Sequence, residues 1–430
     1  MLTLFILSTL LLFFVSMKLK DDYLHPLFGG TFLLYLYGVG GVGITNFIGK
    51  EYLNNYTDNE IFFASLYGFL CMLMYVAGYF IGGRRLNIFS KAPDFLLNRG
   101  GGILAYIFLG IGFVSGIYAM KYFSGSISDF LANTHLRQSN SPGKTWILFF
   151  LIAAKWGFFV LLINGPQENG RFGKWLNYSI GAAVLFLFLL WGRLFVMVYL
   201  VQLIIFIMVY RKLSLKKAMI SGLSLFFVIF VAGVQRWMQG AEGAKDVKGI
   251  ANTIDYALNN VNYIPLLLNN FFDGWYVFLG YIATSLRYDW IMWGGLALGS
   301  FFKMVPGMYS MYSEVFLTDT KRVLNNTYVA GERASNLMGE LFIDFNFLGA
   351  AIFLLIGYYI AFLYKKERNE KNFLVENRNS HLWSLLYAVV LTNLAISIRT
   401  GLAAGLTWLF VDLCWLGIWF VLYGRRNHST

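Results

Sequence analysis

The apolar run over residues 175–210, whose only charged residue is Arg193, constrains the fold more than any other stretch of this chain. Basic residues flank the run on both sides, and basic loops mark the cytoplasmic side of a membrane protein. The run must therefore cross the membrane an even number of times. At ~1.5 Å per residue, two helices of about 17 residues each reach about 25 Å, enough for a slightly thinned bilayer. We predict a helical hairpin over 175–191 and 194–210, with Gly192 and Arg193 at its outer tip.

The composition extends this prediction to the whole chain. Of its 430 residues, 58% are hydrophobic and 13% are charged, whereas soluble domains carry about 25% charged residues. Apolar runs of about 20 residues match the ~30 Å hydrocarbon core of a bilayer. We expect an all-α polytopic membrane protein, with residues 1–430 forming one integral membrane domain. We attribute the formal net charge of +12 to loops that set the topology, and we expect no nucleic-acid partner.

Eleven membrane spans are predicted, and the loops between them alternate between basic and non-basic. The spans cover 1–17, 27–48, 61–83, 102–122, 146–164, 175–191, 194–210, 218–238, 336–363, 382–398 and 402–423. The basic loops contain Lys18, Lys20, Arg84, Arg85, Lys91, Arg99, Arg171, Lys174, Arg211, Lys212, Lys216, Lys217, Lys365, Lys366, Arg368, Lys371, Arg378, Arg425 and Arg426. We assign these loops to the cytoplasm, so the N-terminus lies outside and the C-terminus inside.

The same alternation places one long loop, residues 239–335, outside the membrane. Its stretches rich in Trp, Tyr, Phe and Met predict helices that lie in the membrane interface or fold over the bundle. Loops longer than about 15 residues in a compact protein are usually functional. A second outer loop covers residues 123–145.

Arginines recur at the outer ends of the predicted helices, although positive charge is usually rare on that side. They are Arg137, Arg193, Arg236, Arg287, Arg322, Arg333 and Arg399, and His135 lies two residues before the first of them. The planar guanidinium group suits bidentate contact with phosphate or diphosphate. The alternative is that these side chains extend to the membrane surface and contact lipid headgroups.

Two acidic residues lie near the outer end of the ninth span. Glu340 and Asp344 are four residues apart, so they share one face of a helix, and acids near a helix N-terminus are stabilised by the helix dipole. A charge inside a span needs a partner or a function. Catalysis and simple pairing with Arg236 or Arg399 both remain open.

Lys155 and Asp412 lie near the centres of the fifth and eleventh spans, where a charge costs about 2.5–3.5 kcal/mol even on a lenient insertion scale. Because their charges are opposite, we predict that they pair, and a proton relay is the alternative. Gly112 and Gly116 form a GxxxG pair that predicts close helix packing. The sequence has no HExxH, CxxC, Walker A, GxGxxG or GxSxG motif, so we expect no metal and no cofactor.

The order of these features over roughly residues 100–365 resembles the Wzy-type O-antigen and capsule repeat-unit polymerases. The features are an outer segment "THLRQ", a Gly-Arg hairpin tip, an arginine closing span eight, "GSFFKMVPGMY" in the long loop and "SNLMGELFIDFNFLGA" opening span nine. The family commonly has an Ile-Pro-like segment in this loop, followed by Gly-Glu-x-x-x-x-Phe-Gly. One departure is that Phe345-Asn346 stands where the family has Phe-Gly.

The resemblance implies a glycosyltransferase-C-like fold and a defined reaction. A growing glycan on undecaprenyl diphosphate would be transferred to an incoming lipid-linked repeat unit at the outer face of the bacterial cytoplasmic membrane. Membrane lipid and a chain-length regulator protein are the implied partners, in addition to the lipid-linked oligosaccharide substrates.

The resemblance also gives the candidate residues their roles. A diphosphate leaving group needs cations to stabilise its developing charge, for which Arg137, Arg193 and Arg236 are the first candidates and Arg399 and Arg333 the next. The attacking sugar hydroxyl needs a base, for which Glu340 is the first candidate and His135 the second. Trp275, Tyr276, Trp290 and Trp293 would stack on sugar rings or, alternatively, form an interfacial belt.

Other functions remain open on the sequence alone. An O-antigen ligase would share this topology and chemistry but use a lipid A core as the acceptor. A lipid-linked oligosaccharide flippase, or an ion-coupled transporter that uses Lys155 and Asp412, would move its substrate without forming or breaking a covalent bond. The sequence shows no repeated halves of the kind that transporters commonly have.

Overall fold

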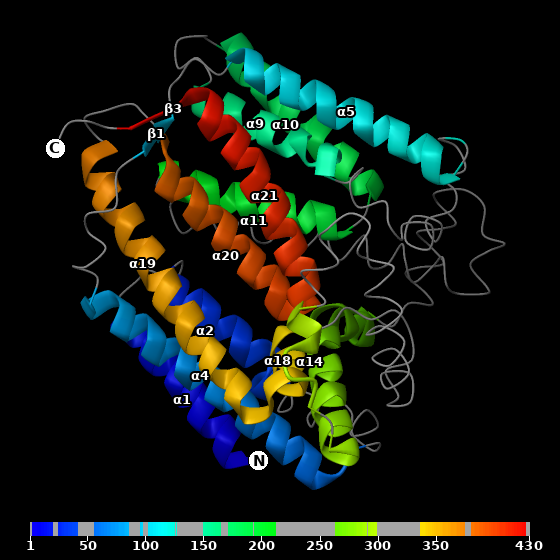
Figure 1. The fold of residues 1–430 in the computed structure, drawn as a ribbon, viewed down its shortest axis with the longest axis vertical. Helices are drawn as coiled ribbons and strands as arrows, with labels where there is room; N and C mark the ends of the chain where they lie inside the picture. The colour runs from blue at the N-terminus through cyan, green and yellow to red at the C-terminus, as the bar shows by residue number, and fades with distance from the viewer. Residues whose placement is uncertain are drawn as a thin grey trace.

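Figure 1 shows the computed structural model, in which helices make up almost all of the described chain. The described residues are 2–19, 25–41, 56–85, 95–97, 102–124, 126, 149–164, 171–191, 193–211, 263–289, 291–298, 336–374 and 380–426. The helices lie in two groups. Helix α20 (Leu382–Thr400) lies between the groups and contributes side chains to the apolar core of each.

The first helix group is built around the crossing of α4 and α19. It comprises α1 (Leu2–Lys18), α2 (Pro26–Tyr37), α4 (Asp58–Arg85), α14 (Tyr263–Tyr288), α18 (Leu337–Phe345) and α19 (Ala350–Leu374). Glycines bring the two central helices together. A Cβ atom on Gly78 of α4 would collide with the carbonyl oxygen of Leu354, and one on Gly357 of α19 would collide with that of Tyr75. Backbones this close leave no room for any side chain.

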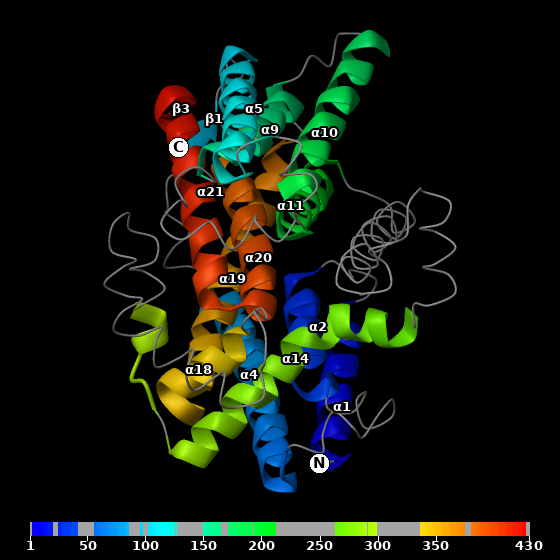
Figure 2. The same ribbon diagram turned by 90° about the vertical axis from the view of Figure 1, so that its right-hand side faces the viewer.

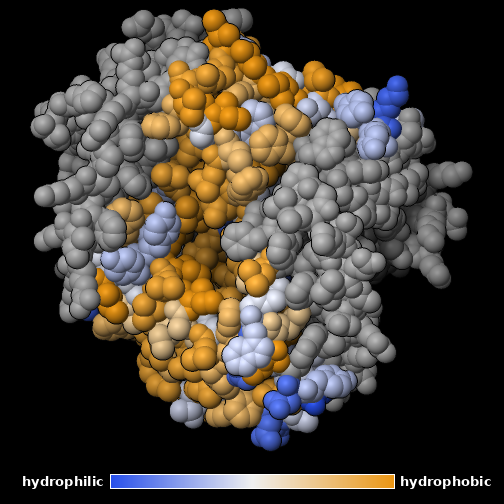
Figure 3. All heavy atoms as spheres, viewed as in Figure 1, coloured by the Kyte–Doolittle hydropathy of each residue, from blue (hydrophilic) through white to orange (hydrophobic). Residues whose placement is uncertain are grey.

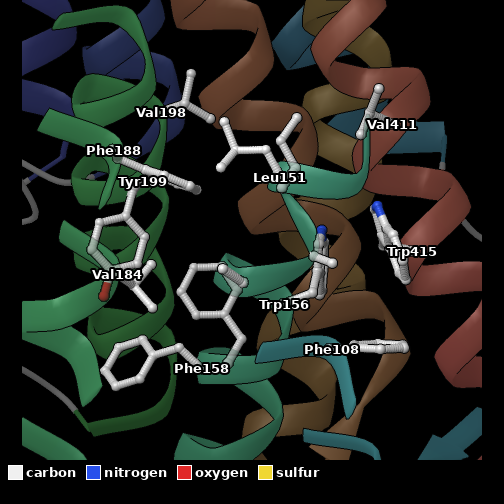
Figure 4. Close-up of a cluster of buried hydrophobic side chains, with 14 of the residues drawn as sticks. Phe108, Leu151, Trp156, Phe158, Val184, Phe188, Val198, Tyr199, Val411 and Trp415 are labelled. Carbon is white, nitrogen blue, oxygen red and sulfur yellow. The ribbon is translucent and has the colours of Figure 1, made fainter. Parts of the chain in front are cut away.

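The second helix group has an aromatic core, which Figure 4 shows. It comprises α5 (Gly102–Ser124), α9 (Ala153–Asn164), α10 (Arg171–Trp191), α11 (Arg193–Arg211) and α21 (Leu402–Tyr423), together with α20. The rings of Phe108 and Trp415 meet edge to face with centroids 4.8 Å apart, and those of Phe188 and Tyr199 do so at 5.6 Å. Edge-to-face contact is a favoured arrangement of aromatic rings.

The hairpin predicted around Arg193 is present in the second group. Helices α10 and α11 are separated by one residue, and they run antiparallel. The ring of Phe188 lies 5.9 Å from that of Phe195, and the Tyr199 hydroxyl donates to the Gly181 carbonyl at 3.3 Å. Each contact joins a residue before the turn to one after it, and residues farther from the turn in α10 contact residues farther from it in α11. This pattern defines a helical hairpin.

The predicted GxxxG pair of α5 also packs as expected. A Cβ atom on Gly112 would collide with the backbone nitrogen of Ala154, and one on Gly116 would lie 2.8 Å from a methyl group of Leu187. The two glycines therefore allow α5 to approach α9 and α10 closely.

One small sheet, which the sequence does not predict, joins three loop segments. Strand β1 (Phe95–Leu97) pairs antiparallel with β2 (Ser380–His381) and with β3 (Gly424–Arg426), in the order β2-β1-β3. The strands follow α4, α19 and α21 respectively. The sheet therefore joins chain segments that follow these three helices, and it lies at one end of the molecule (Figure 1).

Several described helices have the length and composition of membrane spans. Four are long and apolar enough to cross a membrane, and they cover Asp58–Gly83, Ile103–Tyr122, Leu337–Lys365 and Gly405–Leu422. Shorter apolar helices cover Leu2–Lys18, Pro26–Tyr37, Phe149–Leu162, Trp175–Trp191 and Leu385–Thr400. Figure 3 shows apolar side chains over most of the described surface on one face, with hydrophilic residues mainly near its edges. These features are those of a helical membrane protein.

The predicted ninth span, 336–363, matches the candidate membrane segment Leu337–Lys365, and its helix has a break near its start that was not predicted. Helix α18 ends at Phe345, a 3-10 turn (η4) covers Asn346–Gly349, and α19 begins at Ala350. Asn346 has φ 53° and ψ −141°, a conformation that glycine adopts far more readily than other residues. The chain changes direction there. In the predicted second span, α2 ends at Tyr37 and residues 39–41 are again helical. The rest of that span and the predicted span 218–238 lie outside the described residues.

The long loop predicted over 239–335 contains a helix that covers the bundle. Figure 2 shows that α14 runs obliquely across α4, rather than parallel to it. One face of α14 is buried against the first group, with Phe278, Leu279 and Ile282 in its core. This arrangement agrees with a helix folded over the bundle.

Candidate functional site

Glu340 lies in the first turns of α18, which precedes the end of α19 that lies away from the sheet (Figure 1). Asn336 caps this helix, because its side-chain oxygen accepts hydrogen bonds from the backbone of Met338 at 2.9 Å and Gly339 at 3.3 Å. Glu340 is buried, with 7% of its surface exposed. Its Oε2 atom accepts a hydrogen bond from the backbone N–H of Leu402, the first residue of α21. The carboxylate therefore holds the turn between α20 and α21 against α18.

Gly339, which precedes this acid, allows α14 to reach the site. A Cβ atom at this position would lie 2.9 Å from Cδ2 of Tyr281, an aromatic residue of α14. Any larger residue would push α14 away from α18. The Gly-Glu pair thus combines close helix packing with a carboxylate directed at another helix.

Arg399 lies in the last turn of α20, three residues before Leu402. Gly401 ends this helix with φ 88° and donates its backbone N–H to the Ser397 carbonyl at 2.8 Å, as glycine commonly does at a helix C-terminus. Arg399 directly precedes the α20–α21 turn, and Glu340 accepts a hydrogen bond from Leu402 in that same turn. The fold therefore brings a predicted base and a predicted diphosphate ligand to the same short segment.

Arg193 begins α11. Phe195, two residues later, packs edge to face on Trp408 of α21 with ring centroids 4.8 Å apart. Trp408 lies six residues after Leu402, which is about 9 Å along a helix. The tip of the hairpin and the α20–α21 turn therefore lie at the same end of α21.

The remaining predicted ligands cannot be placed in the same way. His135, Arg137, Arg236, Arg333 and Trp290 lie outside the described residues. Tyr276 lies within α14.

The two other predicted sugar-stacking tryptophans have opposite environments. Trp275 is 2% exposed and lies in the core of the first group. The prediction that it stacks on a sugar ring is therefore wrong. It packs where a Cβ atom on Gly41 would collide with its ring. The sequence shows only that α14 is aromatic, because which of its residues are buried depends on contacts with distant helices. Trp293, by contrast, is 76% exposed.

Asp344 does not join Glu340 at the α20–α21 turn, although the two acids are one helical turn apart. Its two carboxylate oxygens accept hydrogen bonds from the backbone N–H groups of Leu296 at 2.9 Å and Ala297 at 2.8 Å. Asp344 is 1% exposed. Each acid thus fastens a different segment of the chain to α18, which the sequence spacing does not indicate.

Lys155 and Asp412 form the ion pair that their positions predict. Lys155 Nζ lies 2.5 Å from Asp412 Oδ1, and both side chains are fully buried in the second group. Lys155 also donates to Oε1 of Gln202 at 2.6 Å. The pair therefore links α9 to α21 and, through Gln202, to α11.

Asp412 accepts hydrogen bonds at both of its oxygens. Oδ1 also accepts from the Trp156 indole N–H at 3.0 Å, and Oδ2 accepts from the side-chain amides of Asn393 at 3.2 Å and Gln202 at 3.4 Å. An ionised carboxylate has about four acceptor positions, and these four donors occupy them. A proton on Asp412 would displace a donor, so the geometry favours a fixed ion pair over a proton relay.

Three members of this network were not predicted from the sequence. Gln202 and Asn393 are polar residues inside predicted spans, and such residues often bond across helices, so they carried a signal. Trp156 carried none, because an indole N–H in an apolar helix has no sequence pattern that reveals its partner.

A second ion pair, also missed, lies where α4 begins. Arg287 at the end of α14 bonds both oxygens of Glu60, from Nε at 2.5 Å and from the terminal nitrogen at 2.8 Å. Thr57 and Glu60 form a capping box, since each side chain accepts from the other's backbone N–H. The hydrogen bond to Glu60 raises the pKa of Arg287. The Thr-x-x-Glu spacing could have located this helix start.

Among the described residues, no three His, Cys, Asp or Glu side chains gather in a way that could hold a metal ion. Comparison of this chain with protein-family models, with curated proteins and with solved structures gives no match.

Proposed function

We propose that this protein is a membrane glycosyltransferase that polymerises lipid-linked oligosaccharide repeat units. It would have eleven membrane spans and a glycosyltransferase-C-like fold. The reaction would transfer a growing glycan from undecaprenyl diphosphate to the repeat unit on a second lipid carrier, at the outer face of the bacterial cytoplasmic membrane.

The observation that supports the proposal most strongly is the backbone conformation of Asn346, which follows Glu340 in the same segment. The family pattern Gly-Glu-x-x-x-x-Phe-Gly requires a glycine where this chain has Asn346. That residue has φ 53° and ψ −141°, which is a glycine-type conformation, and asparagine is among the few other residues that tolerate positive φ. The one departure from the pattern therefore occurs where the structural reason for a glycine is still present.

The chemistry proposed for the site uses the residues at the α20–α21 turn. Glu340 would accept the proton of the attacking sugar hydroxyl, and its hydrogen bond from Leu402 holds the carboxylate in place. Arg399 and Arg193 would bind the diphosphate and stabilise the negative charge that develops as it leaves. A diphosphate leaving group needs stabilisation of its negative charge more than it needs a proton. The guanidinium groups would supply that positive charge in place of a metal ion.

The proposed orientation is supported by the positions of the loops. The three segments joined by the small sheet belong to loops that the charge pattern assigns to the cytoplasm. Glu340 is bonded to the α20–α21 turn, which lies at the end of these two helices away from the sheet (Figure 1). A site there would face the lipid-linked substrates on the outer side.

Deletion of the gene tests the proposed reaction against its alternatives. Loss of a polymerase should leave single repeat units on the surface carrier and remove the long ladder seen by gel electrophoresis. Loss of a ligase should leave long chains on undecaprenyl diphosphate. Loss of a flippase should trap repeat units on the inner leaflet. Either of the last two results would overturn the proposal.

Substitutions test the site. Glu340→Gln should abolish the ladder in correctly inserted protein, whereas the matched change Glu60→Gln, at a carboxylate tied to Arg287, should leave it. Arg193→Ala and Arg193→Lys should both abolish chain extension, because lysine cannot make the bidentate contact. Normal ladders from the Arg193→Lys variant would indicate a simple charge instead of a diphosphate ligand.

A further inference from the structure

The turn around Trp293 holds an exposed indole on an unusual backbone. Trp293 has φ 49° and is followed by Gly294 with φ 85°. A tryptophan in the left-handed region is uncommon, and such residues persist only where the surrounding structure fixes them. Most of the Trp293 side chain nevertheless points away from the protein and takes no part in a core.

Three consecutive residues at the end of α18 fix this turn. The Ile343 carbonyl accepts the backbone N–H of Met292 at 2.9 Å. The Asp344 carboxylate accepts from the two backbone N–H groups described above. The Phe345 ring lies against Gly294, where an added Cβ atom would be 3.2 Å from Cζ. A buried carboxylate, a carbonyl and an aromatic ring thus hold the backbone of the turn that carries one exposed indole.

Other exposed aromatic residues of this chain have a different setting. Tyr106, Tyr118 and Trp175 lie on the regular helices α5 and α10, the arrangement typical of residues at a membrane interface. Among the described residues, Trp293 is the one aromatic residue with positive φ. An interfacial anchor needs no fixed orientation, whereas a ring that must meet a ligand face to face does.

We propose that Trp293 is a sugar-binding platform beside Glu340, and that Asp344 is the residue that positions it. The platform would take one sugar ring of the lipid-linked oligosaccharide against the indole face. Because the turn is fastened to α18 at residues 343–345, it lies within two helical turns of Glu340. This inference rests on the proposed function and names a substrate contact of the same site.

A binding measurement tests the platform. The probe is the repeat-unit oligosaccharide released by mild acid from the surface polysaccharide of the source cells, titrated into the full-length protein in nanodiscs. Trp293→Ala should weaken binding about tenfold, and Trp293→Phe less, because a smaller ring keeps part of the stacking. The matched control is Leu298→Ala, which removes another exposed apolar side chain of the same segment and should change nothing. Equal affinities for the parent and Trp293→Ala would overturn the proposal.

Two further variants test the positioning role without changing the indole. Asp344→Asn replaces one acceptor oxygen by a donor that faces a backbone N–H, and Gly294→Ala places a methyl group against Phe345. Each should raise the substrate concentration needed for half-maximal chain extension while leaving the maximal rate unchanged. A fall in the maximal rate alone would contradict a role that acts through Trp293.

The bilayer is the competing ligand, and lipid quenching tests for it. The fluorescence of Trp293 itself is the difference in fluorescence between the parent protein and the Trp293→Phe variant. In nanodiscs made with brominated phosphatidylcholine, the lipid should barely quench this difference. Strong quenching would place the indole in the membrane and overturn the proposal. If gene deletion removes the ladder but Trp293→Ala binds normally, only this inference fails. If deletion leaves the ladder intact, both proposals fail.

Discussion

The two helix groups satisfy their buried polar groups in different ways. In the first group, the buried hydroxyls of Ser8, Thr31 and Ser65 each donate to the carbonyl four residues back in their own helix. In the second group, Asp412 receives donors from three other helices. These hydroxyl bonds fix nothing between helices. The first group has isolated bonds between helices, such as the one from the Tyr75 hydroxyl of α4 to the Pro26 carbonyl of α2 at 2.8 Å, whereas the network at Asp412 joins four helices of the second group.

The first group has another source of order in its central helices. α4 and α19 meet through glycines, so van der Waals contact between backbones sets their distance. At the end where α18 and α14 meet, acids bonded to backbone N–H groups hold separate segments in place. A buried ion network thus orders the second group, whereas backbone contacts and single carboxylates order the first.

The largest expected effect comes from separating the ion pair of the second group. Lys155→Met leaves Asp412 buried without its cation, which should lower the free energy of unfolding by about 3–5 kcal/mol. Thermal unfolding in detergent, followed by size-exclusion chromatography, measures this loss. The double variant with Asp412→Leu should recover part of it, because both charges are removed but Trp156, Gln202 and Asn393 lose the acceptor they share. A stable single variant would show that Asp412 is not held as an ion.

Forcing apart the glycine contact of the first group should have the next largest effect. Gly357→Ala introduces a methyl group that collides with the Tyr75 carbonyl, and overpacking of this kind costs about 1–3 kcal/mol. The midpoint of thermal unfolding should fall. The control is Gly417→Ala, at a glycine of α21 with no atom within 4 Å of the added methyl group, which should not be destabilised.

Two substitutions of Asn346 test whether the turn after α18 requires a positive φ angle or the asparagine side chain. Asn346→Gly should leave the unfolding midpoint unchanged or raise it slightly. Asn346→Ala should cost about 1–2 kcal/mol, because a residue with a β-carbon and no local hydrogen bond adopts positive φ at that cost. Comparable stability of the two variants would mean that the turn relaxes, and would weaken the comparison with the Phe-Gly pattern.

The smallest effect is expected where α14 is tied to α4. Glu60→Gln removes the ion pair with Arg287. The Arg287 side chain is 32% exposed and that of Glu60 only 6%, so the loss should be about 1 kcal/mol. Added salt should reduce the difference between the parent and the variant only in part, since salt screens the exposed charge more than the buried one. A salt-independent difference would show that the capping box, and not the charge, carries the stability.

The helical character of the chain and a few contacts between helices were predictable, and most of the other contacts were not. The hairpin around Arg193, the pairing of Lys155 with Asp412 and the packing of Gly112 follow from local hydropathy, charge sign and spacing. The break at Asn346 was missed because the apolar pattern continues through it without change. Trp275 was assigned to sugars and lies in a core, because the sequence of α14 does not state which neighbours cover it.

Hydropathy along the chain is enough to predict a set of apolar helices, because hydrophobic runs of span length are unfavourable in water and every backbone group in lipid must bond within its helix. The position of each unusual charge along those helices can also be read from the residues. The partners of Glu340 and Asp344 depend on the fold, since the two acids share a helix face but bond segments far apart in the chain. Those bonds go to backbone N–H groups, which every residue except proline carries, so no residue type in the sequence marks them.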